Sequence, residues 1–335
     1  MKYNITLLTF IVIYMGLIQT SPTATAKEPV NEAIPLGHEE IVLESNGIER
    51  RAFLYVPEHL QHKPEFKSKP TPLVIALHGF GSTAGKAIKD TEWSKKAKEE
   101  SFIVVYPQGS RAQPNKEANV WKNPQSWNDG AGRFHSGQSN INDVAFIKQL
   151  ITNISKGYKI DSKRIFITGF SNGASMTFRL GAELSDRIAA IAPCAGADWN
   201  KHVKLTGKLS IYYITGTEDT LNPINGGLPR IAVSKSKKKR TNDKVKPPVV
   251  VSINKWIKAL DCENKATISR SKNGVETNIY NSKNGNRLVY TTIEGHGHVW
   301  PGSPSKQPKM IVGNASGKLN ATDVIWKFFE TLPVK

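Results

Sequence analysis

The sequence predicts a doubly wound α/β fold, with a mostly parallel sheet and helices on both faces. Short unbroken apolar runs rich in β-branched residues predict strands, because strands buried on both faces of a parallel sheet need such side chains. Amphipathic helical patterns separate these runs from about residue 40 to the end. Of the 335 residues 39% are hydrophobic and 22% charged, a composition that excludes a disordered or collagen-like chain.

The expected elements follow in order. An alternating segment at 49–57 predicts a strand near a sheet edge. Buried strands are expected at 72–77, 102–106, 164–168, 188–192, 209–214 and 288–293. Helices are expected at 143–157, 173–184, from Pro247-Pro248 to 260, and at 322–332.

Residues 1–26 have the pattern of a signal peptide. Lys2 is followed by an apolar run at 7–18, which is too short to span a bilayer comfortably. Ala24-Thr25-Ala26 is a cleavage signal before Lys27. We therefore expect export to the periplasm or the medium, with no membrane association after cleavage and one domain over residues 27–335. An uncleaved signal anchor is the alternative.

The formal net charge is +18, with a dense basic block at 235–246. A nucleic-acid site would need interleaved aromatic residues or a recognition fold, and neither is evident, so no nucleic-acid partner is expected. We interpret the block as a solvated, flexible loop insertion, not a domain boundary. Loose attraction to an acidic polymer stays open.

The strongest local signal is the pentapeptide Gly169-Phe170-Ser171-Asn172-Gly173 between an expected strand and an expected helix. In that context G-x-S-x-G is a nucleophile elbow, which presents the Ser171 hydroxyl on a sharp turn. A tight turn with a capping serine is the alternative. The elbow narrows the prediction to an α/β-hydrolase fold.

A serine nucleophile needs a base and an acid, which in this architecture follow later strands in the order Ser, Asp/Glu, His. Asp219 and His298 stand in those places, after the strands expected at 209–214 and 288–293. Glu218, next to Asp219, and His296, two residues before His298, are the alternative candidates for the acid and the base.

The oxyanion hole needs backbone N–H groups. Asn172, next after the nucleophile, and Phe80, in the loop His78-Gly79-Phe80, are the expected donors. His78 is expected to be a structural histidine of that turn. Trp127 and Trp300 are candidates for the wall of an acyl or aryl pocket, or equally for core aromatic residues.

Several segments resemble the secreted polyhydroxybutyrate-depolymerase-like and feruloyl-esterase-like esterases. They include PLVIALHGFGSTAG, RIFITGFSNGASM, ITGTEDTLNPING and EGHGHVWPG, and the resemblance covers about residues 40–330. It implies Ser171 as nucleophile, Asp219 as acid and His298, rather than His296, as base. The family often has cysteine after His-Gly, where this chain has Phe80.

The resemblance implies a secreted serine carboxylesterase with a Ser-His-Asp triad, which needs no metal and no cofactor. The implied substrates are polyhydroxyalkanoate or feruloyl or acetyl esters of polysaccharide. A serine peptidase of the same fold and a secreted non-catalytic binding protein on a hydrolase scaffold are the alternatives. The oligomeric state stays undetermined.

The two cysteines, Cys194 and Cys262, are expected at opposite edges of the sheet. Because a strand of five or six residues spans about 17–20 Å and bridged cysteines need Cα atoms within about 7 Å, we expect two free thiols, with Cys194 buried.

Overall fold

The structure, a computed structural model, describes residues 32–61, 70–230, 244–270, 273–306 and 308–332. The expected signal peptide at 1–26 and residues 235–243 of the basic block lie outside this part of the chain. No helix among the described residues combines the length and the apolar character needed to cross a membrane.

The described strands form one ten-stranded sheet in the order β1-β2-β4-β3-β5-β6-β7-β10-β9-β8. Their bounds are β1 Glu39–Ser45, β2 Ile48–Tyr55, β3 Thr71–Leu77, β4 Ile103–Pro107, β5 Ile160–Phe170, β6 Ala190–Cys194, β7 Ser210–Gly216, β8 Thr267–Arg270, β9 Val275–Asn281 and β10 Arg287–Ile293. Neighbours from β4 through β3, β5, β6 and β7 to β10 run parallel. Antiparallel strands flank them on both sides, so the mostly parallel sheet is confirmed.

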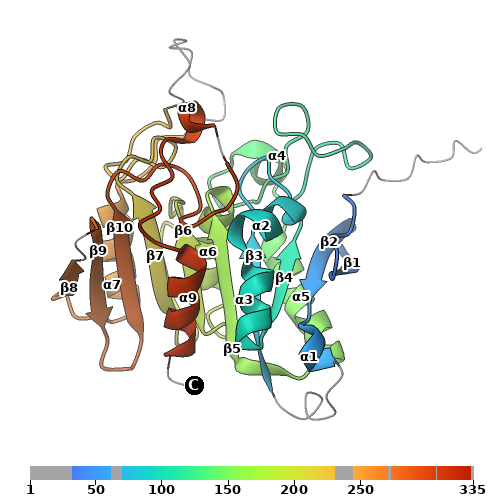
Figure 1. Cartoon of the computed structure of the whole chain (residues 1–335), viewed down its shortest axis with the longest axis horizontal. Coiled ribbons are helices and arrows are strands. Elements are labelled where there is room, and N and C mark those ends of the chain that lie inside the picture. Colours follow the sequence, from blue (N-terminus) through green and yellow to red (C-terminus); the bar gives the residue numbers. More distant parts are fainter. Residues whose placement is uncertain (1–31, 62–69, 231–243, 271–272, 307, 333–335) are drawn as a thin grey trace, which may run out of the picture.

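Helices cover both faces of this sheet (Figure 1). Their bounds are α1 Glu58–Gln61, α2 Ala84–Thr91, α3 Trp93–Glu100, α4 Phe134–Gln138, α5 Asp143–Gly157, α6 Asn172–Glu183, α7 Val249–Ala259, α8 Lys309–Val312 and α9 Ala321–Glu330. Buried side chains of α5, α6 and α7 pack in one apolar cluster, and those of α2, α3 and α9 pack in another.

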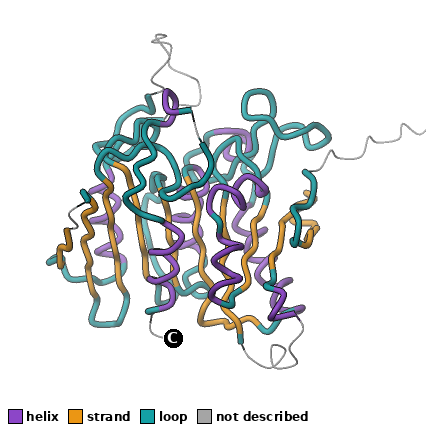
Figure 2. The backbone as a smooth tube through the Cα atoms, in the orientation of Figure 1, coloured by secondary structure: helices purple, strands orange, loops and turns teal. Residues whose placement is uncertain are grey.

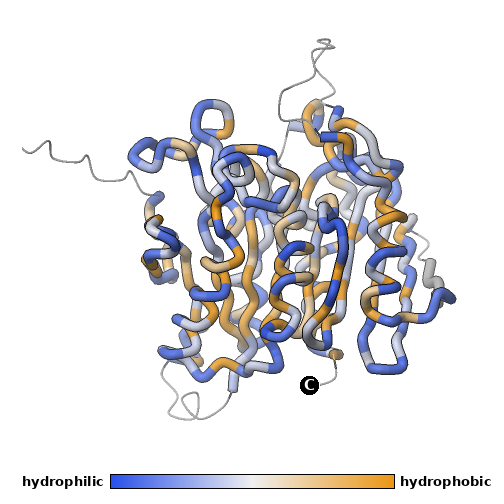
Figure 3. The backbone as a smooth tube through the Cα atoms, turned by 180° about the vertical axis from the view of Figure 1, so that it is seen from behind, coloured by the Kyte–Doolittle hydropathy of each residue, from blue (hydrophilic) through white to orange (hydrophobic). Residues whose placement is uncertain are grey.

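The alternation of side chains along β3 explains why both clusters form. Leu73 and Ile75 belong to the first cluster, and Val74 and Ala76 belong to the second. All four are at most 3% exposed, so each face of the strand needs an apolar side chain. Figure 3 shows the resulting concentration of hydrophobic residues along the central strands.

Several elements differ from expectation. The strand expected at 188–192 is β6, which begins two residues later, because the Ile188 N–H donates to Leu184 O (3.1 Å) and closes the turn that follows α6. Ile188 is buried in that turn, so its apolar side chain extends the apolar pattern of the strand toward the N-terminus. The edge strands β1 and β8, the strand β9 next to β8, and the short helices α2 and α3 were not expected, because polar residues break their apolar pattern.

The carboxyl ends of the parallel strands meet at one edge of the sheet, the upper edge in Figures 1 and 2. The loops that follow β3, β4, β5, β7 and β10 gather there (Figure 2). In open α/β sheets this edge is where functional side chains from distant parts of the chain come together.

Candidate active site

Ser171 occupies the turn between β5 and α6. Its backbone has φ 56° and ψ −116°, a strained conformation for a residue with a side chain. The Ser171 N–H donates to Cys194 O (3.0 Å), which ties the turn to the end of β6. A Cβ on Gly173 would lie 2.6 Å from Leu77 O, and one on Gly169 would lie 2.6 Å from the Gly173 carbonyl carbon. The glycines of the motif therefore allow strand and helix to pass at close range.

His298 and Asp219 lie in line with this serine. His298 Nε2 is 2.8 Å from Ser171 Oγ, and His298 Nδ1 is 2.8 Å from Asp219 Oδ2 and 3.0 Å from Oδ1. Because a carboxylate only accepts, Nδ1 carries the proton and Nε2 is left to accept from the serine hydroxyl. Such an arrangement can remove the serine proton and hold the resulting imidazolium.

Asp219 is buried and well supplied with donors. Its Oδ1 accepts from the backbone N–H groups of Leu221 (2.9 Å) and Asn222 (2.7 Å). Burial alone would raise the pKa of Asp219, but His298, the Asn222 N–H and the Lys246 charge outweigh burial and hold that pKa below its ordinary value. The carboxylate is thereby kept ionised beside His298.

Lys246 corrects one expectation. It was assigned to the solvated basic block at 235–246, yet it is 5% exposed. Its Nζ donates to Asn222 Oδ1 (3.2 Å), and its backbone pairs with Gly227 in both directions. The last residue of the block therefore supports the loop that carries Asp219, because its charge lies near a buried carboxylate.

The two sequence rivals occupy different environments. His296 Nδ1 accepts from the Ser316 N–H (3.0 Å), and Nε2 donates to Val299 O (2.9 Å). Burial lowers the pKa of His296, so the ring is a neutral structural group. Glu218 is exposed, and its backbone N–H donates to His296 O (3.0 Å). Neither side chain has a hydrogen bond to Ser171 or His298 in the described part of the chain.

The loop after β3 lies against the serine. A Cβ on Gly79 would be 3.3 Å from Ser171 Cβ, so the next amide, that of Phe80, lies close to the nucleophile. The N–H groups of Phe80 and Asn172 make no backbone hydrogen bond to any other described residue. Two amides beside the same serine that have no hydrogen-bond partner within the described part of the chain fit the requirement of an oxyanion hole.

His78 holds this loop in place. Its Nδ1 donates to Gly79 O (2.7 Å), and its Nε2 accepts from the Gly109 N–H (2.9 Å). Burial lowers the pKa of His78 to about 4. Both ring nitrogens bond to backbone, which confirms a structural histidine.

Sequence reasoning missed the network around Asn172. The Asn172 amide bonds the Trp127 backbone twice, accepting from N–H (2.8 Å) and donating to O (3.1 Å). Its Nδ2 also donates to Asp129 Oδ2 (2.8 Å), which pairs with Arg133 NH2 (2.6 Å). The segment Ser126-Trp127-Asn128-Asp129 in the sequence was the available signal, but nothing in it indicates which residue it contacts.

The tryptophans expected at the substrate pocket favour the core alternative. Trp127 is 0% exposed, and its Nε1 donates to His78 O (2.9 Å). Trp300 is 4% exposed, with Nε1 donating to Thr322 Oγ1 (3.1 Å). A half-buried aromatic ring beside the triad is that of Phe170, whose centroid lies 4.8 Å from that of the His298 ring. Phe80, in the loop after β3, is also half-buried and stacks on Phe134 at 4.0 Å.

Two further observations concern metals and thiols. Within the described ranges, no cluster of three or more His, Cys, Asp or Glu side chains is arranged to hold a metal ion. Cys194 and Cys262 are both free thiols, and Cys194 is buried, as expected.

Comparison with known proteins identifies relatives of this chain. Residues 64–246, more than half of the sequence, match the family described as phospholipase/carboxylesterase. The chain is 28% identical over 265 residues to poly(3-hydroxyalkanoate) depolymerase C of Paucimonas lemoignei, covering 74% of this chain and 60% of that protein. It is 27% identical over 241 residues to feruloyl esterase B of Piromyces equi, covering 69% and 40%.

These two names confirm the resemblance that the motifs indicated. The matched segments span 60% or less of either relative's own length. Among solved structures, acetyl xylan esterase from Aspergillus awamori matches with a TM-score of 0.53 at 17% identity, covering 78% of this chain and 94% of that one. A likeness at that identity concerns the fold, and it confirms the α/β-hydrolase architecture.

Proposed function

The chain belongs to the phospholipase/carboxylesterase family, and from this membership we propose that it is a serine carboxylesterase that works through an acyl-enzyme. The observation that carries the proposal is the linear arrangement of Ser171 Oγ, His298 and Asp219, with contacts of 2.8 Å on both sides of the imidazole. Family membership supports the reaction class, and this geometry supports the assignment of the three residues.

In the first half of the reaction Ser171 Oγ attacks the ester carbonyl carbon. His298 Nε2 takes the serine proton, and Asp219 stabilises the imidazolium and holds the ring in the required tautomer. The backbone N–H groups of Phe80 and Asn172 stabilise the negative oxygen of the tetrahedral intermediate. The intermediate collapses as His298 returns the proton to the leaving alcohol.

In the second half His298 removes a proton from water, which attacks the acyl carbon bound to Ser171. A second tetrahedral intermediate uses the same two amides. Its collapse expels Ser171 Oγ, which recovers a proton from His298 and releases the carboxylic acid. No metal or cofactor takes part in this proposal.

The names of the relatives support three classes of ester substrate: hydroxyalkanoate esters, feruloyl esters and acetyl esters of polysaccharide. We place the activity in one domain over residues 27–335, exported after removal of residues 1–26. The support for export is the sequence pattern of that leader.

Hydrolysis of p-nitrophenyl acetate and butyrate tests the proposal. Ser171→Ala should lower kcat/KM by about 10⁴-fold or more, whereas Ser155→Ala, on α5, is the matched control and should leave it unchanged. Circular dichroism should show that both variants are folded. Retention of more than a few per cent of activity in Ser171→Ala would contradict the assignment.

A panel of methyl ferulate, hydroxybutyrate oligomers and acetylated xylan then ranks the substrate classes. Hydrolysis of peptide substrates without ester hydrolysis would favour the peptidase alternative. Absence of hydrolysis by the wild-type chain on every substrate would favour a non-catalytic binding protein.

A further inference from the structure

A loop at residues 110–126 stands on the carboxyl edge of the sheet, after β4 (Figure 1). Its two ends are joined by hydrogen bonds between Ser110 and Ser126 in both directions (3.0 and 2.9 Å). Inside it the buried Asn123 amide donates to the carbonyl oxygens of Gln113 (2.8 Å), Lys116 (3.2 Å) and Glu117 (3.1 Å). The loop therefore has a defined shape built from its own polar contacts.

The tip of this loop presents an indole ring to solvent. Asn119 and Asn123 pair through their backbones (3.0 and 2.9 Å), and Asn119 Oδ1 accepts from the N–H groups of Trp121 and Lys122 (2.9 and 3.0 Å). Trp121 is 73% exposed and the adjacent Val120 is 43% exposed. Among the described residues, Trp121 is the one aromatic member of the exposed large hydrophobic set. Four hydrogen bonds thus fix the backbone of the loop tip, from which the Trp121 ring extends into solvent.

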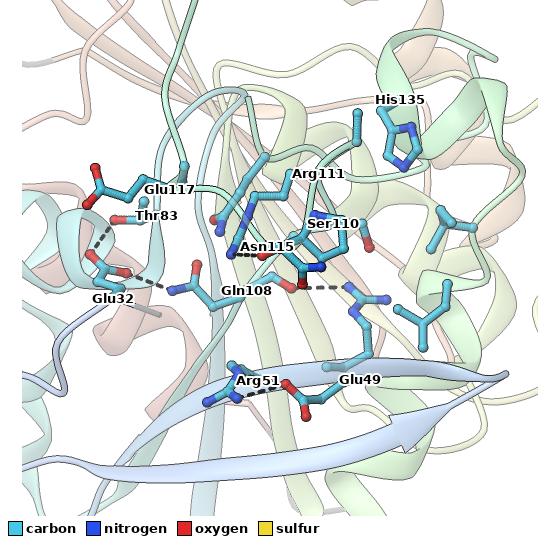
Figure 4. Close-up of a pocket in the computed structure, with 18 of the residues that line it drawn as sticks. Glu32, Glu49, Arg51, Thr83, Gln108, Ser110, Arg111, Asn115, Glu117 and His135 are labelled. Carbon is cyan, nitrogen blue, oxygen red and sulfur yellow. Dashed lines mark hydrogen bonds and ion pairs between the residues drawn. The ribbon is translucent and has the colours of Figure 1, made fainter. Parts of the chain in front are cut away.

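Other residues of the loop line a cavity of about 790 Å³, whose wall also includes residues of the hairpin of β1 and β2 (Figure 4). Ser110, Asn115 and Glu117 contribute to its wall from the loop. Ser110 Oγ is buried without a hydrogen-bond partner in the described part of the chain. Asn115 and Glu117 are exposed. The wall therefore offers an amide and a carboxylate to a ligand.

The loop also adjoins the candidate oxyanion loop. The Gly81 N–H donates to Gln125 O (2.8 Å), and a Cβ on Gly81 would lie 2.6 Å from Val120 Cγ2. Because Gly81 follows Phe80, the segment that carries Trp121 packs directly on the wall of the catalytic site.

We propose that the Trp121 loop and the cavity behind it bind the sugar chain of a polysaccharide ester, the alcohol part of the substrate. The C–H face of a pyranose ring covers apolar aromatic surface such as that of Trp121. Sugar hydroxyls both donate and accept, so they can satisfy the amide and carboxylate groups of the cavity wall.

A polyhydroxyalkanoate is the less suitable occupant. Its chain has ester oxygens that accept hydrogen bonds but no donors between its ends. Glu117 only accepts, so contact with that chain would remove water from the carboxylate without replacing its hydrogen bonds. The proposal deepens the proposed function and rests on it for the reaction, whereas polysaccharide binding can be measured without the reaction.

Binding is tested in a Ser171→Ala background, with xylohexaose and acetylated xylan as probes. Isothermal titration calorimetry should show about tenfold weaker binding when Trp121→Ala is added. Val250→Ala, which removes another exposed apolar side chain on α7, is the matched control and should bind as the background does. Equal binding by all three variants would overturn the proposal.

Kinetics in the active enzyme gives the second measurement. Trp121→Ala should lower the ratio of kcat/KM on acetylated xylan to kcat/KM on p-nitrophenyl acetate by about tenfold. Trp121-dependent binding of hydroxybutyrate oligomers, without binding of xylohexaose, would overturn the sugar assignment. If the wild-type chain hydrolyses no ester while the Ser171→Ala variant still binds xylohexaose through Trp121, the proposed function fails and the binding site stands.

Discussion

Single residues at this site are held by backbone contacts more than by other side chains. Ser171 keeps its strained φ of 56° because its N–H donates to Cys194 O (3.0 Å) and its carbonyl accepts from the Ser175 N–H (3.0 Å). Such conformations cost about 1–3 kcal/mol each and persist where the surroundings determine them. His78 and His296 likewise bond backbone at both ring nitrogens. His298 differs, because both its nitrogens contact side chains, the Asp219 carboxylate at Nδ1 and the Ser171 hydroxyl at Nε2.

The first prediction separates the two histidines of the segment that follows β10. His298→Ala should lower kcat/KM on p-nitrophenyl acetate by about 10⁴-fold, because it removes the base. His296→Ala should lower it much less and should reduce thermal stability, because it leaves the Ser316 N–H and Val299 O unpaired. Steady-state kinetics and thermal unfolding of both variants are the measurements. A larger activity loss in His296→Ala would mean that the base is assigned two residues too late.

At the scale of elements, the site depends on how a loop meets a helix. The loop at 126–133 contacts the first residue of α6 through Trp127 and Asp129, on either side of Asn128. The Asn172 side chain links these contacts to the backbone N–H that we assign to the oxyanion hole. Asp129 is therefore a positioning residue, since it touches Asn172 and Arg133 but not Ser171 or His298.

Asp129→Asn tests that assignment. We expect kcat to fall about tenfold or more with little change in KM, because a displaced donor weakens transition-state stabilisation. The inhibition constant of a phenylboronic acid, which mimics the tetrahedral state, should rise in parallel. Asp198→Asn is the control, because Asp198 is also 2% exposed and pairs with Lys255 (2.6 Å). An equal loss of kcat in both variants, with unchanged boronate inhibition, would reduce Asp129 to a structural role.

At the scale of the whole molecule, burial of titratable groups makes stability depend on pH. The pKa of His78 falls from 6.5 to about 4 on burial, and that of His296 is lowered for the same reason. At a pH between about 4 and 6.5, His78 binds a proton in the unfolded chain but not in the folded chain. Lowering the pH through this window therefore favours the unfolded state. Asp219 contributes to the pH dependence of stability only at lower pH, because its pKa in the folded chain lies below its ordinary value of 3.8.

We therefore expect the free energy of unfolding to fall by about 3 kcal/mol between pH 7 and pH 4 on account of His78. Urea unfolding at pH 7, 6, 5 and 4 measures it. His78→Gln, which keeps one donor and one acceptor, should flatten the dependence between pH 6.5 and 4. A wild-type stability that does not change over this range would contradict a neutral, buried His78.

The two thiols give the last prediction, which depends on the topology of the whole sheet. Burial and the Asp219 charge raise the pKa of Cys194 well above its ordinary value, and burial raises that of Cys262 to about 11. Both should react slowly with a disulfide reagent at pH 8 in the folded protein, because little thiolate is present. In guanidinium, without reductant, two thiols per chain should react. Finding none in a monomer would mean that the two cysteines are bridged.

Much of this arrangement follows from the sequence alone, because burial on both faces demands unbroken apolar strands and the elbow demands glycine beside the serine. The strands 72–77 and 209–214, the helix Asp143–Gly157 and the order Ser171, Asp219, His298 are all readable in that way. The outer strands β1, β8 and β9 are less readable, because polar residues interrupt the apolar pattern of strands at or next to the sheet edge.

Only the tertiary structure decided which neighbours meet. Sequence placed Trp127 equally in a pocket and in the core, and packing put it in the core against His78 and Asn172. Lys246 belongs to a basic block in sequence, yet the fold buries it beside Asn222. The local sequence pattern indicates a residue's own polarity and period, whereas the partner of a buried polar group lies 24 to 49 residues away in these cases. Such pairings exist only once the chain has closed its sheet and brought the loops to one edge.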